Sequence, residues 1–215
     1  MAGLWKKLDT SQDIPFHVTS QDEIFYAREY ISEGGYEASE ANSLIINFKK
    51  DISRKGKPEW YYKEQAIRKF ALELGRAVME NAVLAAIPSS IWELDPKYDS
   101  RMDDMLAQAK GFKPSLILEK PFVANQTTTP SHHGGTRNPQ EIYDNLVWRG
   151  FSQPTNLVLL VDDVLTSGAH FRACKRLIQE HHPNVRVVGV FWAKTVWPDA
   201  PELDVQLSPD KKWEL

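Results

Sequence analysis

Residues 156–171, NLVLLVDDVLTSGAHF, decide the fold of this chain. Leu157 to Val161 form an uncharged apolar run, which predicts a buried strand. We expect this strand to end on two adjacent carboxylates, Asp162 and Asp163, and a Thr166-Ser167-Gly168 turn then leads into a segment with helical character. A strand that runs through a polar turn into a helix is typical of an open α/β sheet, in which ligands bind at the carboxyl ends of the strands.

Each part of this stretch suits a sugar phosphate. Two carboxylates can accept hydrogen bonds from neighbouring ribose hydroxyls, and charged acceptors make such bonds about twice as strong as neutral ones. The turn offers hydroxyls and backbone N–H groups, and the first N–H groups of a helix are unpaired and favour an anion. A structural alternative is a buried strand, a solvated Asp-Asp turn and a Thr or Ser helix cap.

The string VLLVDDVLTSGAHF resembles the phosphoribosyl-pyrophosphate signature of the type I phosphoribosyltransferases. The resemblance implies that Asp162 and Asp163 contact the ribose hydroxyls, while the following turn wraps the 5-phosphate. This chain departs from the signature at position 170, where the family usually has Thr. The residue here is His170, which could donate a hydrogen bond to phosphate or cap the helix. The implied phosphate-binding residues are Leu165, Thr166, Ser167, Gly168, Ala169 and His170.

The reaction implied by this resemblance transfers phosphoribosyl from 5-phosphoribosyl 1-pyrophosphate to a nitrogen acceptor and releases pyrophosphate. Carboxylates would ease the positive charge that develops on the ribose, and magnesium with Arg101 would ease the leaving group. Mg²⁺ keeps several waters, so we expect it to arrive with the pyrophosphate and to reach Asp162 and Asp163 through water, without direct protein ligands. Asp162, Asp163 and Arg101 are the expected catalytic residues.

Other segments predict a doubly wound, mostly parallel α/β core over residues 60–196. Ala169 to Glu180 is expected to be a helix and Val185 to Trp192 a strand, and such a strand–helix–strand unit implies parallel pairing. Upstream, the apolar spacing predicts a helix, a strand, a second helix and a second strand at residues 64–80, 82–87, 101–110 and 115–118.

The ends of the chain differ from this core. Residues 1–59 are expected to form an N-terminal α+β extension, with a strand over 24–31 and a helix-like cluster over 40–52. This extension could cap the sheet, complete a substrate hood or form a subunit interface. Residues 197–215 are expected to be a tail packed on the core.

A transferase of this kind needs a second anion site, for pyrophosphate. Pro88, Ser89 and Ser90 follow the first core strand, where peptide N–H groups and hydroxyls can hold phosphate, although such a turn is also ordinary structure. Arg101 is our candidate for neutralising pyrophosphate, because guanidinium binds phosphate bidentately; the alternative is a solvated helix start whose Asp residues favour its N-terminus.

Two further residues are candidates for substrate binding. Arg137 ends a Ser131–Arg137 loop and could reach a phosphate, and Lys194 follows the last core strand, where members of the resembled family often contact the nucleobase. The order of the 88–90 turn, the helix at Arg101 and Arg137-Asn138 is loosely similar to that in competence-protein-F-like phosphoribosyltransferases.

Composition limits the class of protein. A chain of 215 residues with 42% hydrophobic content can bury a substantial core. Its net charge of −3 argues against a broad nucleic-acid-binding face, although a local basic patch stays open. The single cysteine, Cys174, excludes an intramolecular disulfide. Because no apolar run is long enough to span a membrane and no signal-peptide pattern opens the chain, we expect a cytoplasmic protein.

The main alternative function is a non-catalytic or partner-restrained subunit that binds a sugar phosphate or nucleotide. An effector in a bacterial anti-phage (retron-type) or toxin system would be one example. This alternative stays open because proteins that share a fold do not all share its chemistry. The N-terminal segment and seven tryptophans leave room for a homo-oligomer or a larger complex. A hydrolase that uses the Asp pair is disfavoured, because DDVLTSG does not match the DxDxT/V nucleophile motif.

Overall fold

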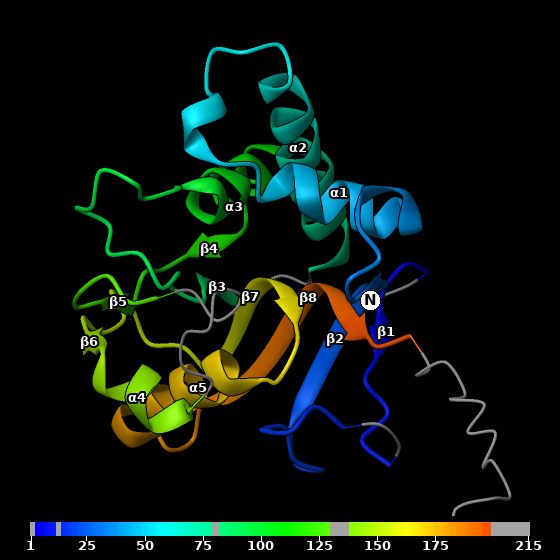
Figure 1. The fold of residues 1–215 in the computed structure, drawn as a ribbon. Helices are drawn as coiled ribbons and strands as arrows, with labels where there is room; N and C mark the ends of the chain where they lie inside the picture. Colours follow the sequence, from blue (N-terminus) through cyan, green and yellow to red (C-terminus); the bar gives the residue numbers. More distant parts are fainter. Residues whose placement is uncertain (1–2, 12–13, 79–81, 130–137, 199–215) are drawn as a thin grey trace, which may run out of the picture.

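The computed structural model describes residues 3–11, 14–78, 82–129 and 138–198, which form one six-stranded sheet with helices on both faces (Figure 1). The elements, in chain order, are β1 (Lys6–Lys7), β2 (Glu23–Ile31), α1 (Glu40–Phe48), α2 (Trp60–Ala77), β3 (Val83–Ala86), α3 (Arg101–Phe112), β4 (Ile117–Leu118), β5 (Phe122–Ala124), α4 (Pro139–Asp144), β6 (Leu146–Trp148), β7 (Leu157–Leu165), α5 (Ala169–His181) and β8 (Arg186–Val196), with short 3-10 helices at Tyr36–Ala38 and Ile52–Arg54.

The central sheet is mostly parallel. Its strand order is β1-β2-β8-β7-β3-β4, and every neighbouring pair is parallel except β1 with β2. Strands β5 and β6 pair separately as an antiparallel ribbon. The expected α/β class, with a mostly parallel sheet covered on both faces, is confirmed, and so is the parallel pairing on either side of α5.

Alternation along the strands divides the core between the two faces. Leu84, Leu159 and Val161 belong to the core under α1, α2 and α3, whereas Val83, Val158 and Leu160 pack with α5 on the other face. Successive side chains of a strand point to opposite faces, so a strand buried on both faces reads as a continuous apolar run. Within the described ranges, no helix is both long and apolar enough to cross a bilayer.

Strand β7 is longer than its apolar run. It continues through Asp162 and Asp163 to Leu165, so the expected end of the strand at this pair of carboxylates is wrong. Strand β8 runs on to Val196 and supplies backbone partners for this extension, with Asp162 opposite Phe191 and Leu165 opposite Lys194. Backbone pairing with a longer neighbour therefore carries the strand past the point where its side chains turn polar.

The region 1–59 contributes to the same sheet and the same core. The expected strand and helix are both present as β2 and α1, and β2 pairs in parallel with β8 along nearly its whole length. Phe48 at the end of α1 is fully buried and lies 5.0 Å from the ring centre of Phe70, which stacks on Trp192 at 4.4 Å. The division into extension, core and tail stays a prediction, and most of the expected tail lies outside the described residues.

This packing predicts that α1 unfolds together with the sheet. Phe48→Ala should lower the free energy of unfolding by about 3–5 kcal/mol, because it empties a closed aromatic cluster. Phe16→Ala is the matched control, since Phe16 also lies in the first 59 residues but is 87% exposed, and it should change stability by less than about 0.5 kcal/mol. Urea denaturation measures both; a Phe48→Ala protein whose main transition is unshifted would contradict a shared core.

Candidate functional site

A cavity of about 680 Å³ lies at the carboxyl ends of β7 and β8, beside the start of α5. Nearly all the candidate site residues from the sequence line it: Pro88, Ser89, Ser90, Arg101, Asp162, Asp163, Leu165, Thr166, Ser167, Gly168, Ala169 and His170. Lys194 is not part of the lining, and its neighbour Thr195 is. Arg137 lies outside the described residues.

The two aspartates are directed to different sides of β7. Alternation places Asp163 in phase with Leu159 and Val161, on the face that α1 and α3 cover. Asp162 is in phase with Leu160, and its charge acts on the buried Cys174 of α5. The adjacent carboxylates therefore occupy different electrostatic surroundings, which the motif alone does not indicate.

Asp163 is buried and held by two cations. The Nζ atom of Lys49 lies 3.0 Å from its Oδ1 atom, and the Nη2 atom of Arg101 lies 3.1 Å from its Oδ2 atom. Burial by itself would raise the pKa of this carboxyl, but Lys49 and Arg101 outweigh burial and lower it to about 2. Asp163 is consequently ionised at any physiological pH.

Asp162 behaves in the opposite way. Burial, with the negative charge of Asp163 next to it, raises its pKa to about 7 from an ordinary value of 3.8. Its Oδ1 atom accepts the backbone N–H of Asp163 at 2.8 Å, which opposes the shift but does not cancel it. Near neutral pH this carboxyl exists in both forms, so it can donate or accept a hydrogen bond at the cavity wall.

A buried lysine, Lys63 of α2, positions the cations around Asp163. Its Nζ atom donates to the carbonyl oxygens of Phe48 and Lys50 at 2.9 and 2.8 Å, and so satisfies carbonyls at the end of α1. It also donates to Asp99 Oδ2 at 2.6 Å, and Asp99 in turn accepts from Arg101 Nη1 at 3.0 Å. One side chain thus ties the end of α1 to the start of α3.

Arg101 is engaged before any ligand arrives. Both of its terminal nitrogens face carboxylates, and its Nε atom is buried without a hydrogen-bond partner among the described residues. A phosphate in the cavity would have to share Arg101 with Asp99 and Asp163. Arg101 therefore contributes positive charge to the site while it also holds Asp163 in place.

The turn before α5 contains a glycine in the left-handed region and is tied to the end of β8. Gly168 has φ 80°, in the left-handed region that favours glycine, and gives α5 no side-chain cap. A Cβ atom there would lie 2.7 Å from Val18 Cγ2, so a side chain from the N-terminal region fills the space behind the glycine. The Oγ1 atoms of Thr166 and Thr195 lie 2.9 Å apart, which fixes the turn to the end of β8. Gly168, Ala169 and His170 at the start of α5 line the cavity, and the N-terminal end of a helix favours an anion.

The 88–90 turn adjoins the Asp pair. The backbone N–H of Ile87 donates to Val161 O at 2.9 Å, so the turn starts directly beside Asp162. The hydroxyl of Ser89 donates to Ile91 O within its own turn, which makes it less available to phosphate than we expected. His170 lies at the wall of the same cavity, and burial lowers its pKa, which keeps the imidazole neutral at pH 7.

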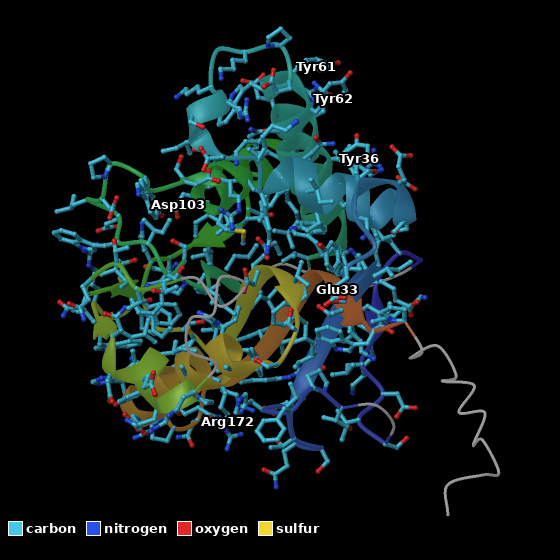
Figure 2. The ribbon with its side chains drawn as sticks, viewed as in Figure 1. Glu33, Tyr36, Tyr61, Tyr62, Asp103 and Arg172 are labelled. Carbon is cyan, nitrogen blue, oxygen red and sulfur yellow. The ribbon has the colours of Figure 1, made fainter. Side chains whose placement is uncertain are left out.

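Several lining residues were not predicted from the sequence. Tyr30 near the end of β2 lines the cavity, as do Ser32 and Glu33, which follow that strand; Figure 2 shows Glu33 beside the end of β2. Glu33 has φ 61°, a conformation that costs a non-glycine residue about 1 kcal/mol. Parallel pairing of β2 with β8 brings these residues to the cavity. The predicted strand over 24–31 was the one sequence signal that pointed to them. Lys49 was not predicted as a site residue because it precedes residues 60–196, where we expected the core and the site.

The part of the chain that the structure describes offers few protein ligands for a metal ion. Among the described residues, no three His, Cys, Asp or Glu side chains converge into a group that could hold one. Asp163 is already neutralised by Lys49 and Arg101. Asp162 is the carboxylate at the cavity wall that a hydrated, ligand-borne cation could approach.

We expect the same Asp→Asn substitution to have opposite effects on stability at positions 162 and 163. Asp163→Asn should destabilise the protein by about 2–4 kcal/mol at pH 7, because it leaves two cations without their shared counter-charge. Asp162→Asn should stabilise it by about 1–2 kcal/mol at pH 8 and by little at pH 4, because the folded protein binds a proton at Asp162 that the unfolded chain loses between about pH 4 and 7. The wild-type protein accordingly loses stability as pH rises through this window.

Urea denaturation of both variants at pH 4 and pH 8 measures these differences. The adjacent positions serve as controls for each other, since the change in volume and polarity is the same. Equal loss of stability in the two variants at pH 8 would contradict the separation of their surroundings.

No protein-family model matches the chain, and no curated protein is significantly similar to it in sequence. Among solved structures, the chain is similar to the xanthine-guanine-hypoxanthine phosphoribosyltransferase of Helicobacter pylori, with a TM-score of 0.33 and 11% sequence identity over 66% of this chain and 84% of that chain.

Proposed function

We propose that the protein binds 5-phosphoribosyl 1-pyrophosphate together with Mg²⁺ and transfers phosphoribosyl to a nitrogen acceptor. The observation that carries this proposal is the meeting of three features in one cavity: a carboxylate pair, the N-terminus of α5 behind a Thr-Ser-Gly turn, and the 88–90 turn. The similarity of residues 158–171 to the type I phosphoribosyltransferase signature supports the same assignment.

In this proposal, each feature would hold one part of the substrate. The 5-phosphate would lie at the start of α5, where Gly168 provides no side-chain cap and the helix dipole favours an anion. The ribose hydroxyls would face Asp162, whose carboxyl can accept or donate near pH 7. The diphosphate would lie toward Ser90 and Arg101, on the side of the cavity next to β3.

In the proposed reaction, the bond from ribose C1 to the diphosphate oxygen breaks and a bond from C1 to the acceptor nitrogen forms. The acceptor nitrogen loses its proton to solvent, and pyrophosphate leaves with its bonding electron pair. The partly ionised Asp162 would stabilise positive charge on the ribose ring, Asp163 would hold Arg101 in place, and Arg101 would stabilise the leaving group. A Mg²⁺ ion that arrives with the diphosphate would supply further neutralisation of the leaving group, and Asp162 could reach it through water.

The proposal predicts pyrophosphate release that requires both Mg²⁺ and an acceptor. We expect turnover with at least one member of a panel of nucleobases and amines, measured as pyrophosphate formed from the sugar donor. Asp162→Asn should lower kcat/KM by about tenfold or more, because a neutral amide cannot stabilise the developing charge. Asp9→Asn is the control, since Asp9 is an exposed carboxylate that does not line the cavity, and it should leave the rate unchanged.

Ligand binding separates the proposal from its alternative. A ligand at one hundred times its Kd should stabilise the protein by about 2.7 kcal/mol in thermal unfolding. Stabilisation by the sugar donor without turnover on any acceptor would favour a non-catalytic or partner-restrained subunit. If neither the sugar donor nor any nucleotide at millimolar concentration shifts unfolding, the sugar-phosphate site itself is refuted.

A further inference from the structure

Lys49 is a cavity-lining cation supplied by the N-terminal region. It caps the C-terminal end of α1, its side chain is 38% exposed, and it lines the same cavity as Ser90, Asp163 and the turn before α5. The C-terminal end of α1 is held by Lys63, which binds the carbonyl oxygens on both sides of Lys49. The position of Lys49 is thus set by the fold before any ligand binds.

Among the described residues, three cationic side chains line this cavity, and they differ in how many of their donors are already used. Lys50 donates to Asn47 Oδ1 and to the carbonyl oxygen of Glu59, and Arg101 lies between Asp99 and Asp163 with 19% of its side chain exposed. Within the described residues, the Nζ atom of Lys49 has one partner, Asp163 Oδ1 at 3.0 Å. An ammonium group has three donors, so Lys49 can bind an anion without giving up its ion pair.

We propose that Lys49 is a binding residue for the diphosphate of the ligand. The inference rests on the proposed function and names a contact that its signature does not contain. Lys49 and Arg101 approach opposite oxygens of Asp163, so the two cations converge on one point of the cavity wall. A diphosphate carries more charge than a phosphate monoester and gains more from such a pair of cations.

The subsite for the 5-phosphate is built differently. The N–H groups at the start of α5 and the hydroxyls of Thr166 and Ser167 supply dipoles there. Arg101 lines the main cavity and also a smaller hollow of about 70 Å³ together with Pro88 and Ser89 of the 88–90 turn, and it shares Asp163 with Lys49. The positive charge shared by Lys49 and Arg101 therefore belongs to the side of the cavity that we assign to the diphosphate.

Binding of magnesium pyrophosphate alone tests this role, because it leaves ribose contacts out of the measurement. By calorimetric titration, Lys49→Gln should raise the Kd for magnesium pyrophosphate by about tenfold or more, as expected for the loss of a charge-assisted hydrogen bond. The Kd for ribose 5-phosphate should change by less than about threefold. Lys69→Gln is the matched control, since Lys69 is 41% exposed and pairs with Glu40 and Glu73 outside the cavity, and it should leave both constants unchanged.

A double variant distinguishes direct binding of the ligand by Lys49 from an indirect effect through its ion pair with Asp163. In the Asp163→Asn protein, Lys49 has no carboxylate to neutralise, so a role limited to Asp163 predicts no effect of adding Lys49→Gln. We expect the Kd for magnesium pyrophosphate still to rise about tenfold in that background. An unchanged Kd there, or a larger effect on ribose 5-phosphate than on pyrophosphate, overturns the inference.

The same titrations distinguish this inference from the proposed function. A wild-type protein that binds neither magnesium pyrophosphate nor the sugar donor refutes the proposed function, and the role of Lys49 with it. A wild-type protein that binds pyrophosphate, with a Lys49→Gln variant that binds it equally well, refutes only the role of Lys49.

Discussion

A network of buried and half-buried charged side chains holds the site together. It runs from Lys63 through Asp99 and Arg101 to Asp163 and Lys49, with nitrogen–oxygen distances from 2.6 to 3.1 Å. Removing Asp163 would leave Lys49 without a carboxylate partner among the described residues and would leave Arg101 with Asp99 alone, in a region of low dielectric. This network of ion pairs joins α1, α2, α3 and β7, so the arrangement of these four elements depends on it.

This constraint also explains why one motif contains two kinds of carboxylate. Strand geometry turns Asp162 and Asp163 to different sides of β7, and the cations lie on the side of Asp163. One carboxyl is consequently ionised at all physiological pH values, while the pKa of the other lies near 7. Pairs of titratable groups whose surroundings separate their pKa values are typical of functional sites.

Local sequence patterns predicted most of the elements. The apolar spacing that predicted α2 and α5 reflects one buried helix face, and the apolar run of β7 reflects burial on both faces of a parallel sheet. The predicted end of β7 was wrong, because residues 162–165 are held in the strand by pairing with β8. Such pairing cannot be recognised from the polarity of the β7 sequence itself. The 88–90 turn was placed correctly beside the motif, but the internal hydrogen bond of Ser89 was not foreseen.

The sequence by itself determined the α/β class, the strand–turn–helix at residues 157–181 and the glycine at the start of α5, because each of these depends on neighbours along the chain. Only the tertiary structure decided which side chains meet those residues in space. Lys49 reaches Asp163, Val18 fills the space behind Gly168, and β2 brings Tyr30 to the rim, all from the first 59 residues. These contacts join residues far apart in the chain, and they follow from strand order and helix packing, which local periodicity does not encode.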